Sequence, residues 1–319
     1  MADTIRVGVS SCLLGNPVRY DGGHKRDSYV VDTLGRYFEF VPVCPEIECG
    51  LGVPREAMRL VGDPEAPRLV TIKTGIDLTE RMNAWAAARV AELAEERLCG
   101  FIFKAKSPSS GMTRIKVYND KGAPAERGVG LFARAFMDRF PLIPVEDEGR
   151  LHDDKLRENF IERIFAMQRF RDAVAGDGRS TLVSRLIAFT AGHKLLFMAH
   201  SPELARQIGR LTAEASKWPA DGLVHAYETL LMKTLALPAT PAKHANVLQH
   251  AMGYFKTVLS ADEKAELNEV IANYRLGLTP LIVPVTLIVH FTRKYDVAYL
   301  KDQAYLAPHP IELKLRNHA

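Results

Sequence analysis

Two cysteines and one serine-rich segment stand directly after short apolar runs in the first half of the chain. Cys12 follows the run Ile5–Val9, Cys44 follows Phe38–Val43, and the segment Lys106–Gly111 follows Gly100–Ala105. Each apolar run is typical of a β-strand. If the strands lie side by side in a parallel sheet, the segments after them meet at its carboxyl edge, where open α/β sheets place their sites. Thiolates that converge there indicate a soft-metal or cluster site, and a disulfide is not expected.

The residues around each cysteine bear on whether its sulfur could bind a metal. A single cysteine after a strand is more often a small buried apolar residue than a ligand. Here Cys12 is followed by a turn with Gly15 and Pro17, which frees backbone amides near the sulfur. Amide donors lower the pKa of a thiol, and the thiolate is the form that binds metal. Cys44 is followed by a proline and then by the carboxylate of Glu46.

Several polar residues near the cysteines have both a plain and a functional interpretation. Glu46 is either a surface carboxylate or a general base that acts on water. Ser107 and Ser109 either form the turn after a strand or hydrogen-bond a heteroatom of a substrate. Lys104 and Lys106 are either solvated strand ends or a rim that attracts anions.

The segment 19–26 combines an aromatic ring, three cations and two glycines. It is either a solvated loop or a loop that stacks on bases and contacts phosphates beside the cysteine site. The side chains that would make these contacts are those of Arg19, Tyr20, His24, Lys25 and Arg26.

The first half alternates strands with helices, which predicts an α/β domain with a mainly parallel sheet over residues 1–150. Asp77 and Glu80 form a capping-box pattern at the start of a helix that should run to about Leu98. A Gly/Pro-rich stretch, 50–67, is expected to connect elements. The other expected elements are helices over 26–37 and 129–140 and strands over 69–73 and 142–145.

The second half, residues 151–319, is predicted to be an all-α domain, because helical periodicity dominates and strand patterns are scarce. A charged segment, 146–154, marks the boundary. The expected helices lie near 155–175, 180–200, 202–217, 221–236, 240–258, 261–275 and 280–300.

Composition narrows the class of protein. The chain has 319 residues, of which 47% are hydrophobic and 25% charged, and this is typical of a globular protein with room for two cores. No apolar stretch is expected to span a membrane, and the most apolar window, 278–291, contains two prolines and is interpreted as buried. Four cysteines are too few for a disulfide scaffold, and no secretory signal is visible, so a reducing cytoplasm is the expected compartment.

Charge and histidine content differ between the halves. Residues 1–150 hold 21 basic and 21 acidic residues, whereas residues 151–319 hold 21 and 17 together with nine of the ten histidines. None of the helical histidines has the spacing of a zinc-binding helix, so a metal is not expected there. Cations near helix ends either form a solvated face or follow an RNA backbone. They are Lys194, Lys243, His244, Lys256, Arg293 and Lys294.

The first domain resembles the thiouracil desulfidase family through three motifs that agree in order and spacing over about residues 4–147. The motifs are Cys12-Leu13-Leu14-Gly15 with Val18-Arg19-Tyr20-Asp21-Gly22, Pro42-Val43-Cys44-Pro45-Glu46 with Gly50-Leu51 and Pro54-Arg55, and Lys104-Ala105-Lys106-Ser107-Pro108-Ser109-Ser110-Gly111. The second half resembles a helical domain often fused to that family. The fused form is similar to bacterial desulfidases that act on 4-thiouridine in tRNA.

The resemblance implies a 4Fe–4S cluster held by three protein ligands, with one iron open to the sulfur of the substrate. It implies attack of water on the ring carbon and release of sulfide through that iron. Cys12 and Cys44 would be ligands, Glu46 the acid/base and Ser107 a substrate contact. Ser11 and Ser109 would adjoin the cofactor, and Lys104, Lys106, Lys194, His244 and Lys256 would contact the substrate or RNA together with the 19–26 loop. The partner would be tRNA with 4-thiouridine, or a free thiouracil-type base.

One position departs from the family pattern, because its third cysteine ligand is Ser110 here. Three explanations are open: an introduced Cys→Ser change, native ligation by Ser110, or replacement by Cys49 or Cys99. Cys49 is favoured over Cys99, which precedes the third strand, and the introduced change is favoured over both. The departure also allows a rival function, a non-catalytic RNA-binding or regulatory protein that has lost its cluster. A structural zinc on Cys12, Cys44 and Cys49 is less favoured.

Overall fold

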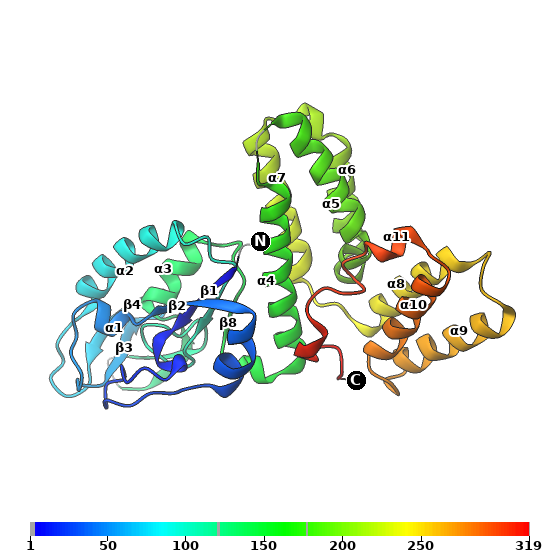
Figure 1. Ribbon diagram of the computed structural model, residues 1–319. Helices are drawn as coiled ribbons and strands as arrows, with labels where there is room; N and C mark the ends of the chain where they lie inside the picture. The colour runs from blue at the N-terminus through cyan, green and yellow to red at the C-terminus, as the bar shows by residue number, and fades with distance from the viewer. Residues whose placement is uncertain (1–3, 120–121, 177, 319) are drawn as a thin grey trace. The chain divides into compact units, whose positions relative to one another are not determined.

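The computed structural model of the protein describes residues 4–119, 122–176 and 178–318 (Figure 1). The chain divides into two compact units, Met1–Leu156 and Arg157–Ala319. The first unit is α/β with a mainly parallel sheet, and the second is mostly helical, as the sequence predicts.

The first sheet contains the three predicted strands. β1 (Ile5–Ser10) lies between β2 (Phe38–Val43) and β5 (Gly100–Phe103), and β8 (Val145–Asp147) follows β5 at the edge. All three pairings are parallel. The carboxyl ends of β1, β2 and β5 therefore lie at one edge of this sheet, as expected. The strand predicted over 142–145 is displaced, because β8 begins only at Val145.

A second sheet was not predicted. Its order is β4 (Ala66–Thr71), β3 (Met58–Asp63), β6 (Ile115–Tyr118) and β7 (Pro124–Gly128). Two antiparallel pairs, β3–β4 and β6–β7, are joined through a parallel β3–β6 contact. The stretch 50–67, expected only to connect elements, contains β3, whose single fully buried side chain is Leu60. A strand with so few buried residues leaves little pattern to detect.

The helices of the first unit are α1 (Pro45–Glu48), α2 (Thr79–Ala94) and α3 (Leu131–Arg139). The predicted capping box at Asp77 is wrong, because Asp77 pairs with Val70 beside β4 and α2 begins two residues later. The main-chain amide of Leu69 also donates to the Thr79 hydroxyl, which ties the first turn of α2 to the sheet. The helix expected over 26–37 is reduced to a π-helical turn at Tyr29–Thr33 and a 3-10 turn at Leu34–Arg36.

An aromatic cluster fills the core between the first sheet and the helices α2 and α3. The Phe101 and Phe103 rings of β5 stack with centroids 4.3 Å apart, and Phe136 of α3 packs 4.7 Å from Phe101. Gly8 of β1 makes room for this cluster, because a Cβ there would lie 2.2 Å from the Phe101 ring. This packing fixes β1 and β5 against each other and thereby positions the loops at their carboxyl ends.

The second unit contains the seven predicted helices and one short additional helix. They are α4 (Asp154–Val174), α5 (Arg179–His200), α6 (Pro202–Ala213), α7 (Ala220–Ala236), α8 (Pro241–Met252), α9 (Ala261–Arg275), α10 (Ile282–Lys294) and α11 (Ala298–Lys301). α5 contacts α6, α7 and α8, which makes it a central helix of this unit.

The expectation that no stretch could span a membrane needs correction at α5. Among the described residues, Thr181–His200 is the one helix long and apolar enough by composition to do so, with a mean hydropathy of 1.3. Of that window, 44% is buried inside the protein. Its neighbours α6, α7 and α8 account for the apolar composition, because a core helix must be apolar on several faces.

Candidate functional site

A cavity of about 400 Å³ opens at the carboxyl edge of the first sheet, where the predicted motifs meet. Side chains from the loops after β1, β2 and β5 line it. They include Ser11, Cys12, Arg19, Tyr20, Lys25, Cys44, Glu46, Arg55, Lys104, Lys106, Ser107 and Ser110. The loops that carry the two cysteines and the serine-rich segment therefore surround one space. We call this space the cavity.

Short helical turns place both cysteines at this edge. Cys12 lies in the 3-10 turn Ser11–Leu14, which ends at Gly15 with a left-handed φ of 97°. Cys44 precedes Pro45 at the start of α1, and its main-chain amide donates to Glu48 Oε1 over 2.7 Å. Glu48 was not singled out from the sequence. Its carboxylate fixes the backbone of Cys44 while the thiol faces the cavity.

Both thiols favour the protonated state, contrary to the expectation that amide donors would lower their pKa. Burial raises the pKa of Cys12 to about 11, although Lys104 opposes the change. Burial raises the pKa of Cys44 to about 12, and the nearby Glu46 carboxylate adds to the effect. The Cys44 Sγ lies 3.6 Å from Glu46 Oε2 and 3.9 Å from the Val18 carbonyl, both of which are acceptors. A thiol in such surroundings is a small buried donor until a cation replaces its proton.

The carboxylate of Glu46 contacts two other segments of the first unit and the nearby Cys44 thiol. Its Oε1 accepts a hydrogen bond from the Ser109 hydroxyl, and its Oε2 faces the Cys44 thiol. The Arg55 guanidinium lies 3.9 Å from Oε2 and also donates to the Val18 carbonyl over 3.0 Å. Arg55 is thus a site residue to which the sequence analysis assigned no role, although it named Arg55 within a family motif. It links the loop after β1 to the carboxylate after β2.

The serine-rich loop is a compact turn anchored on α3. The main-chain amides of Ser109 and Ser110 both donate to Ser107 Oγ, and the Ser109 carbonyl accepts from the first turn of α3 at Phe132 and Ala133. Gly130 permits this close approach, because a Cβ there would lie 2.5 Å from the Ser109 carbonyl. Ser107 and Ser110 line the cavity, whereas Ser109 lies behind its wall.

The family's third ligand position is also at the cavity, and there it holds the hydroxyl of Ser110. Neither alternative cysteine replaces it. The Cys49 thiol faces the Glu46 carbonyl at 3.4 Å and packs in an apolar cluster with Leu60 and Met82. Cys99 is fully buried at the opposite end of β5. Replacement by Cys49 or Cys99 and a zinc site that includes Cys49 are therefore both wrong.

The donor set can be compared with what an iron–sulfur cluster requires. Clusters of this kind are held by thiolates, and at the three ligand positions of the family the cavity offers the thiols of Cys12 and Cys44 and the hydroxyl of Ser110. The residues fit the cluster at two positions, and at the third they supply a harder oxygen. No group of three or more His, Cys, Asp or Glu side chains that could hold a single metal ion occurs among the described residues.

The loop 19–26 contributes only part of the predicted rim. Arg19, Tyr20 and Lys25 line the cavity, and the Arg19 guanidinium lies over the Tyr20 ring, 5.4 Å from its centroid. His24 and Arg26 do not line it. Arg26 forms an ion pair with Asp32 instead. The loop therefore offers an aromatic face with a cation beside it, which suits a planar heterocycle.

On the other side of the cavity, the two lysines after β5 differ from each other. The Lys104 ammonium is paired with Glu148, and its main-chain amide donates to Ser10 Oγ over 2.8 Å. Lys106 is exposed at the rim. Ser11, predicted beside the cofactor, also lines the cavity, and its hydroxyl accepts from the Asn16 amide over 2.7 Å.

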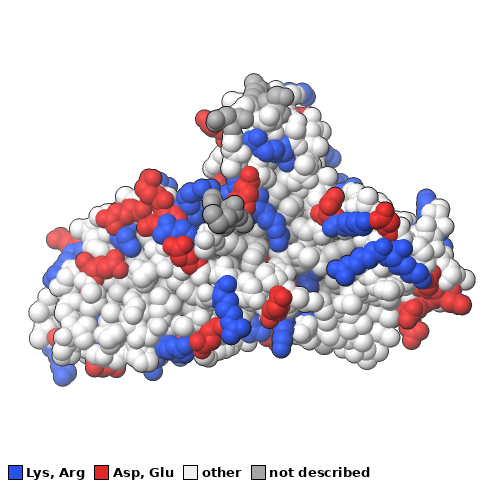
Figure 2. All heavy atoms as spheres, in the orientation of Figure 1, with Lys and Arg blue, Asp and Glu red and all other residues white. Residues whose placement is uncertain are grey.

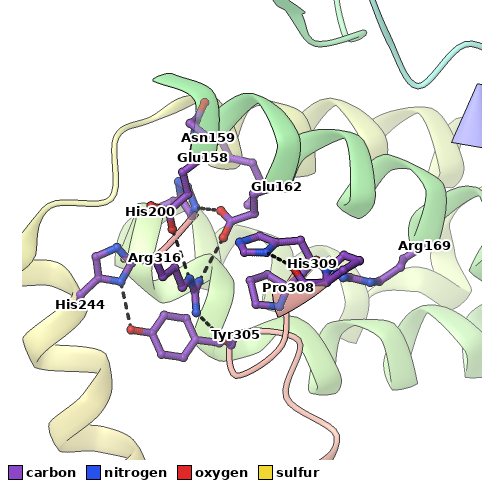
Figure 3. Close-up of polar contacts among 12 residues, drawn as sticks. Glu158, Asn159, Glu162, Arg169, His200, His244, Tyr305, Pro308, His309 and Arg316 are labelled. Carbon is purple, nitrogen blue, oxygen red and sulfur yellow. Dashed lines mark hydrogen bonds and ion pairs between the residues drawn. The ribbon is translucent and has the colours of Figure 1, made fainter. Parts of the chain in front are cut away.

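The RNA contacts predicted in the second unit are only partly accessible. Lys194, Lys256 and Arg293 are exposed, whereas Lys294 pairs with Glu263 and Lys243 donates to the His200 carbonyl. The prediction for His244 is wrong, because its side chain is buried and contacts the Tyr305 hydroxyl at 3.0 Å (Figure 3). Burial lowers the pKa of His244 to about 3, so the ring is a neutral core residue.

Comparisons with known proteins agree with the two units. Residues 7–148 match the 2-thiouracil desulfurase family, and residues 194–310 match DUF1722, a family of unknown function. The uncharacterized protein YbgA of Escherichia coli K12 is 33% identical over 133 residues, which cover 41% of this chain and 79% of YbgA. The uncharacterized protein YbbK of Bacillus subtilis 168 is 32% identical over 108 residues, which cover 32% of this chain and 71% of YbbK.

A solved structure, that of the 4Fe–4S-dependent thiouracil desulfidase TudS, is 31% identical with a TM-score of 0.39 and covers 47% of this chain and 94% of its own. The chain belongs to the 2-thiouracil desulfurase family, in a form fused to a DUF1722 region.

Proposed function

We propose that this protein removes sulfur from 4-thiouridine in tRNA, with the first unit catalytic and the second unit holding the RNA. One observation carries the proposal. In a member of the 2-thiouracil desulfurase family, two thiols, a carboxylate and a serine hydroxyl from separate loops line a single cavity. Hydrolysis of a C=S group needs a soft metal that accepts sulfur, a base for water and a donor to the heterocycle. The two thiols would hold the metal, and the carboxylate and the hydroxyl would supply the base and the donor.

The proposed cofactor is a 4Fe–4S cluster, which Cys12, Cys44 and Ser110 would hold. When bound, such a cluster supplies a Lewis-acidic iron that polarises a thiocarbonyl. Both thiols must lose their protons for this. The raised pKa values of the thiols therefore predict that cluster assembly releases protons and is favoured by alkaline pH.

The residues around the cavity divide the remaining tasks. Glu46 is placed to take a proton from water, and Arg55 beside it keeps the carboxylate oriented. Tyr20, with Arg19 over its ring, offers a stacking surface for the base. The Ser107 hydroxyl contacts the substrate from the opposite loop.

A stacked aromatic pair in the second unit, of which Tyr254 is exposed and Tyr299 is half-buried, supports RNA over a free base as the substrate. Tyr254 stacks on Tyr299 of α11 with centroids 4.6 Å apart, and His250 packs against the edge of Tyr254. The Tyr254 side chain is 37% exposed, and the exposed Lys256 is two residues away. Figure 2 shows further lysine and arginine side chains over the part of this unit that carries α8, α10 and α11. Stacking rings beside cations are typical of surfaces that bind unpaired nucleotides.

The proposal is tested by anaerobic reconstitution of the unchanged chain, Ser110→Cys and Glu46→Gln with iron and sulfide. We expect Ser110→Cys to bind more iron than the unchanged chain, because a thiolate replaces a hard oxygen. We expect Ser110→Cys and the unchanged chain both to convert 4-thiouridine in tRNA to uridine. Glu46→Gln should bind iron but should turn over the substrate about 100-fold more slowly. Absence of iron in Ser110→Cys would overturn the proposal.

The RNA assignment is tested separately with Tyr254→Ala and Lys256→Gln. Tyr254→Ala should weaken binding of tRNA about 5-fold to 100-fold, since the stacking of one base contributes about 1–3 kcal/mol. Lys256→Gln should also weaken binding and should lower its dependence on salt, because it removes a charge that contacts phosphate. Neither should change turnover of free 4-thiouracil. Arg210→Gln, an exposed cation on α6, is the matched control. Unchanged tRNA affinity in both variants would leave free thiolated bases as the substrate.

The serine at position 110 favours one rival function. A chain without its third cysteine could be a non-catalytic RNA-binding or regulatory protein that keeps the fold and has lost its cluster. Iron and acid-labile sulfide analysis of the anaerobically prepared unchanged chain, repeated on Ser110→Cys, separates the two. A colourless protein that binds tRNA favours the rival. A protein that contains iron and turns over favours the desulfidase.

A further inference from the structure

Ser109 is the one residue of the serine-rich loop whose side chain connects two groups of the cavity without lining it. We propose that Ser109 is a positioning residue that relays protons between Glu46 and Ser107 behind the wall of the cavity. This inference rests on the proposed function and adds a route by which the proton taken from water reaches the other side of the substrate.

The direction of each hydrogen bond follows from the donors and acceptors present. The main-chain amides of Ser109 and Ser110 donate to Ser107 Oγ over 3.3 Å and 3.1 Å. A hydroxyl has two lone pairs and one proton, so two amide donors occupy its acceptor capacity. Its own proton therefore points to Ser109 Oγ, 3.0 Å away. The Ser109 proton in turn points to Glu46 Oε1. A single chain of donors runs from Ser107 through Ser109 to the carboxylate.

The surroundings of Ser109 keep this chain away from solvent. Ser109 is 0% exposed, whereas Glu46 and Ser107 both line the cavity. The first turn of α3 holds the Ser109 backbone through two hydrogen bonds to its carbonyl, and the missing side chain of Gly130 allows that contact. The relay is thus closed to water at its centre and open to the cavity at both ends. A buried hydroxyl held in this way can pass a proton without exchange with the bulk.

The relay completes the addition of water. Water oxygen bonds to the ring carbon, the π pair of the C=S bond moves to sulfur, and the released proton goes to Glu46. Both serine hydroxyls then turn, so that Ser109 donates to Ser107 Oγ in place of the 3.3 Å bond from the Ser109 main-chain amide. Glu46 passes the proton to Ser109 Oγ, Ser109 passes its own proton to Ser107 Oγ, and Ser107 passes its own proton to the sulfur. Each serine ends as a neutral hydroxyl and Glu46 ends as a carboxylate. One water molecule has then been added across the C=S bond.

Two variants test the relay in the reconstituted full-length protein. Ser109→Ala removes the hydroxyl and should lower kcat about 100-fold, with KM within about twofold, since a positioned proton transfer contributes about 10²–10⁴-fold. Ser109→Thr keeps the hydroxyl and should recover most of the rate. Thr234→Val removes a buried hydroxyl of α7 that bonds only within its own helix, and it serves as the control. Iron content should be equal in all four proteins, because Ser109 is not a ligand.

A readout specific to proton relay is the dependence of kcat on the deuterium fraction of the solvent. The natural chain should give a curved plot, because several protons move together, and Ser109→Ala should give a straight one. An unchanged kcat, a curved plot in Ser109→Ala, or loss of iron in that variant would overturn the proposal.

If the natural chain binds iron but has no desulfidase activity, the proposed function fails independently. The relay is then judged on the cluster-free protein by proton NMR. A slowly exchanging hydroxyl resonance downfield of the amides, lost in both Ser109→Ala and Glu46→Gln, supports the relay. Its absence in the natural chain overturns the relay.

Discussion

The two units both bury charged and titratable side chains, but they use them in opposite ways. In the first unit, Glu46 and the two thiols line a cavity, so each still has a side free to meet a ligand. In the second unit, Glu162, His200 and Arg316 are almost fully buried and bond to one another (Figure 3). Polar groups that line a cavity can bind and react with a ligand, whereas polar groups that hydrogen-bond to one another in the core stabilise the fold.

The buried cluster of the second unit connects segments far apart in the chain. Glu162 of α4 bonds to His200 of α5 over 2.6 Å and to Arg316 over 3.2 Å. His200 also donates to the Leu237 carbonyl, so both ring nitrogens face acceptors. Arg316 additionally donates to Glu158 and to the Tyr305 carbonyl. Burial alone would raise the pKa of Glu162, but His200 and Arg316 outweigh it and lower the pKa to about 2.

The largest effect on the free energy of unfolding should come from breaking this cluster. Arg316→Met keeps much of the volume but removes the buried cation that pairs with both Glu158 and Glu162, and we expect the free energy of unfolding to fall by about 3–5 kcal/mol. Denaturant unfolding of the second unit, followed by its helical circular dichroism, measures this. Iron binding by the first unit should be unchanged. A loss below about 1 kcal/mol would show that the buried cluster contributes little to stability. The second unit would then not differ from the first in how it uses its buried charges.

A double change gives the matched control. Glu158→Gln together with Arg316→Met removes one of the unpaired carboxylates, so part of the lost stability should return. If the double variant were as unstable as the single one, the unpaired charge would not be the cause.

A smaller effect is expected from pH, through histidines that the second unit buries as neutral rings. Burial lowers the pKa of His193 and of His309 to about 4 and that of His244 to about 3. In the unfolded chain these rings take up protons near pH 6.5, so each stabilises the folded state above that pH and destabilises it as the pH falls toward 4. Glu158, whose pKa burial raises to about 7, opposes this trend between pH 4.5 and 7.

His193→Gln isolates one of these contributions. The His193 ring stacks on Phe189 and bonds to the Phe189 carbonyl through Nδ1, a bond that a glutamine amide can replace. Between pH 7 and pH 5.5 the natural chain should lose about 1 kcal/mol more unfolding free energy than the variant does. Denaturant midpoints at both pH values provide the measurement. Equal losses would mean that His193 is protonated in the folded protein.

The same contrast explains how much the sequence alone could reveal. β1 and β5 lie in the middle of a parallel sheet and read as apolar runs, so their ends and the motifs there were predictable. β3 buries only Leu60 fully and β6 is four residues long with two buried side chains, so neither gives a long pattern, and the second sheet was missed. The long helices of the second unit were predictable because their apolar residues recur with helical spacing over 12 residues or more.

At the candidate site, the residue types were predictable and their connections were not. Cys12, Cys44 and Ser107 follow strands, which is a local pattern. The contact of Arg55 with Glu46 and the link from Ser109 to the same carboxylate join segments that are distant in sequence. His244 was mistaken for a surface residue, because nothing near it in the chain indicates that Tyr305 covers it.

The smallest effect on stability is expected where the functional consequence is largest. Glu46 is partly exposed at the cavity, and Glu46→Gln keeps an acceptor for the Ser109 hydroxyl while removing a charge beside Cys44. We expect the unfolding free energy of the cluster-free protein to change by less than about 0.5 kcal/mol, although turnover falls about 100-fold. Denaturant unfolding of the two proteins side by side provides the measurement. A loss of several kcal/mol would show that Glu46 stabilises the fold, as the buried cluster of the second unit does. The exposure of its carboxylate to the cavity would then be no evidence for a catalytic role.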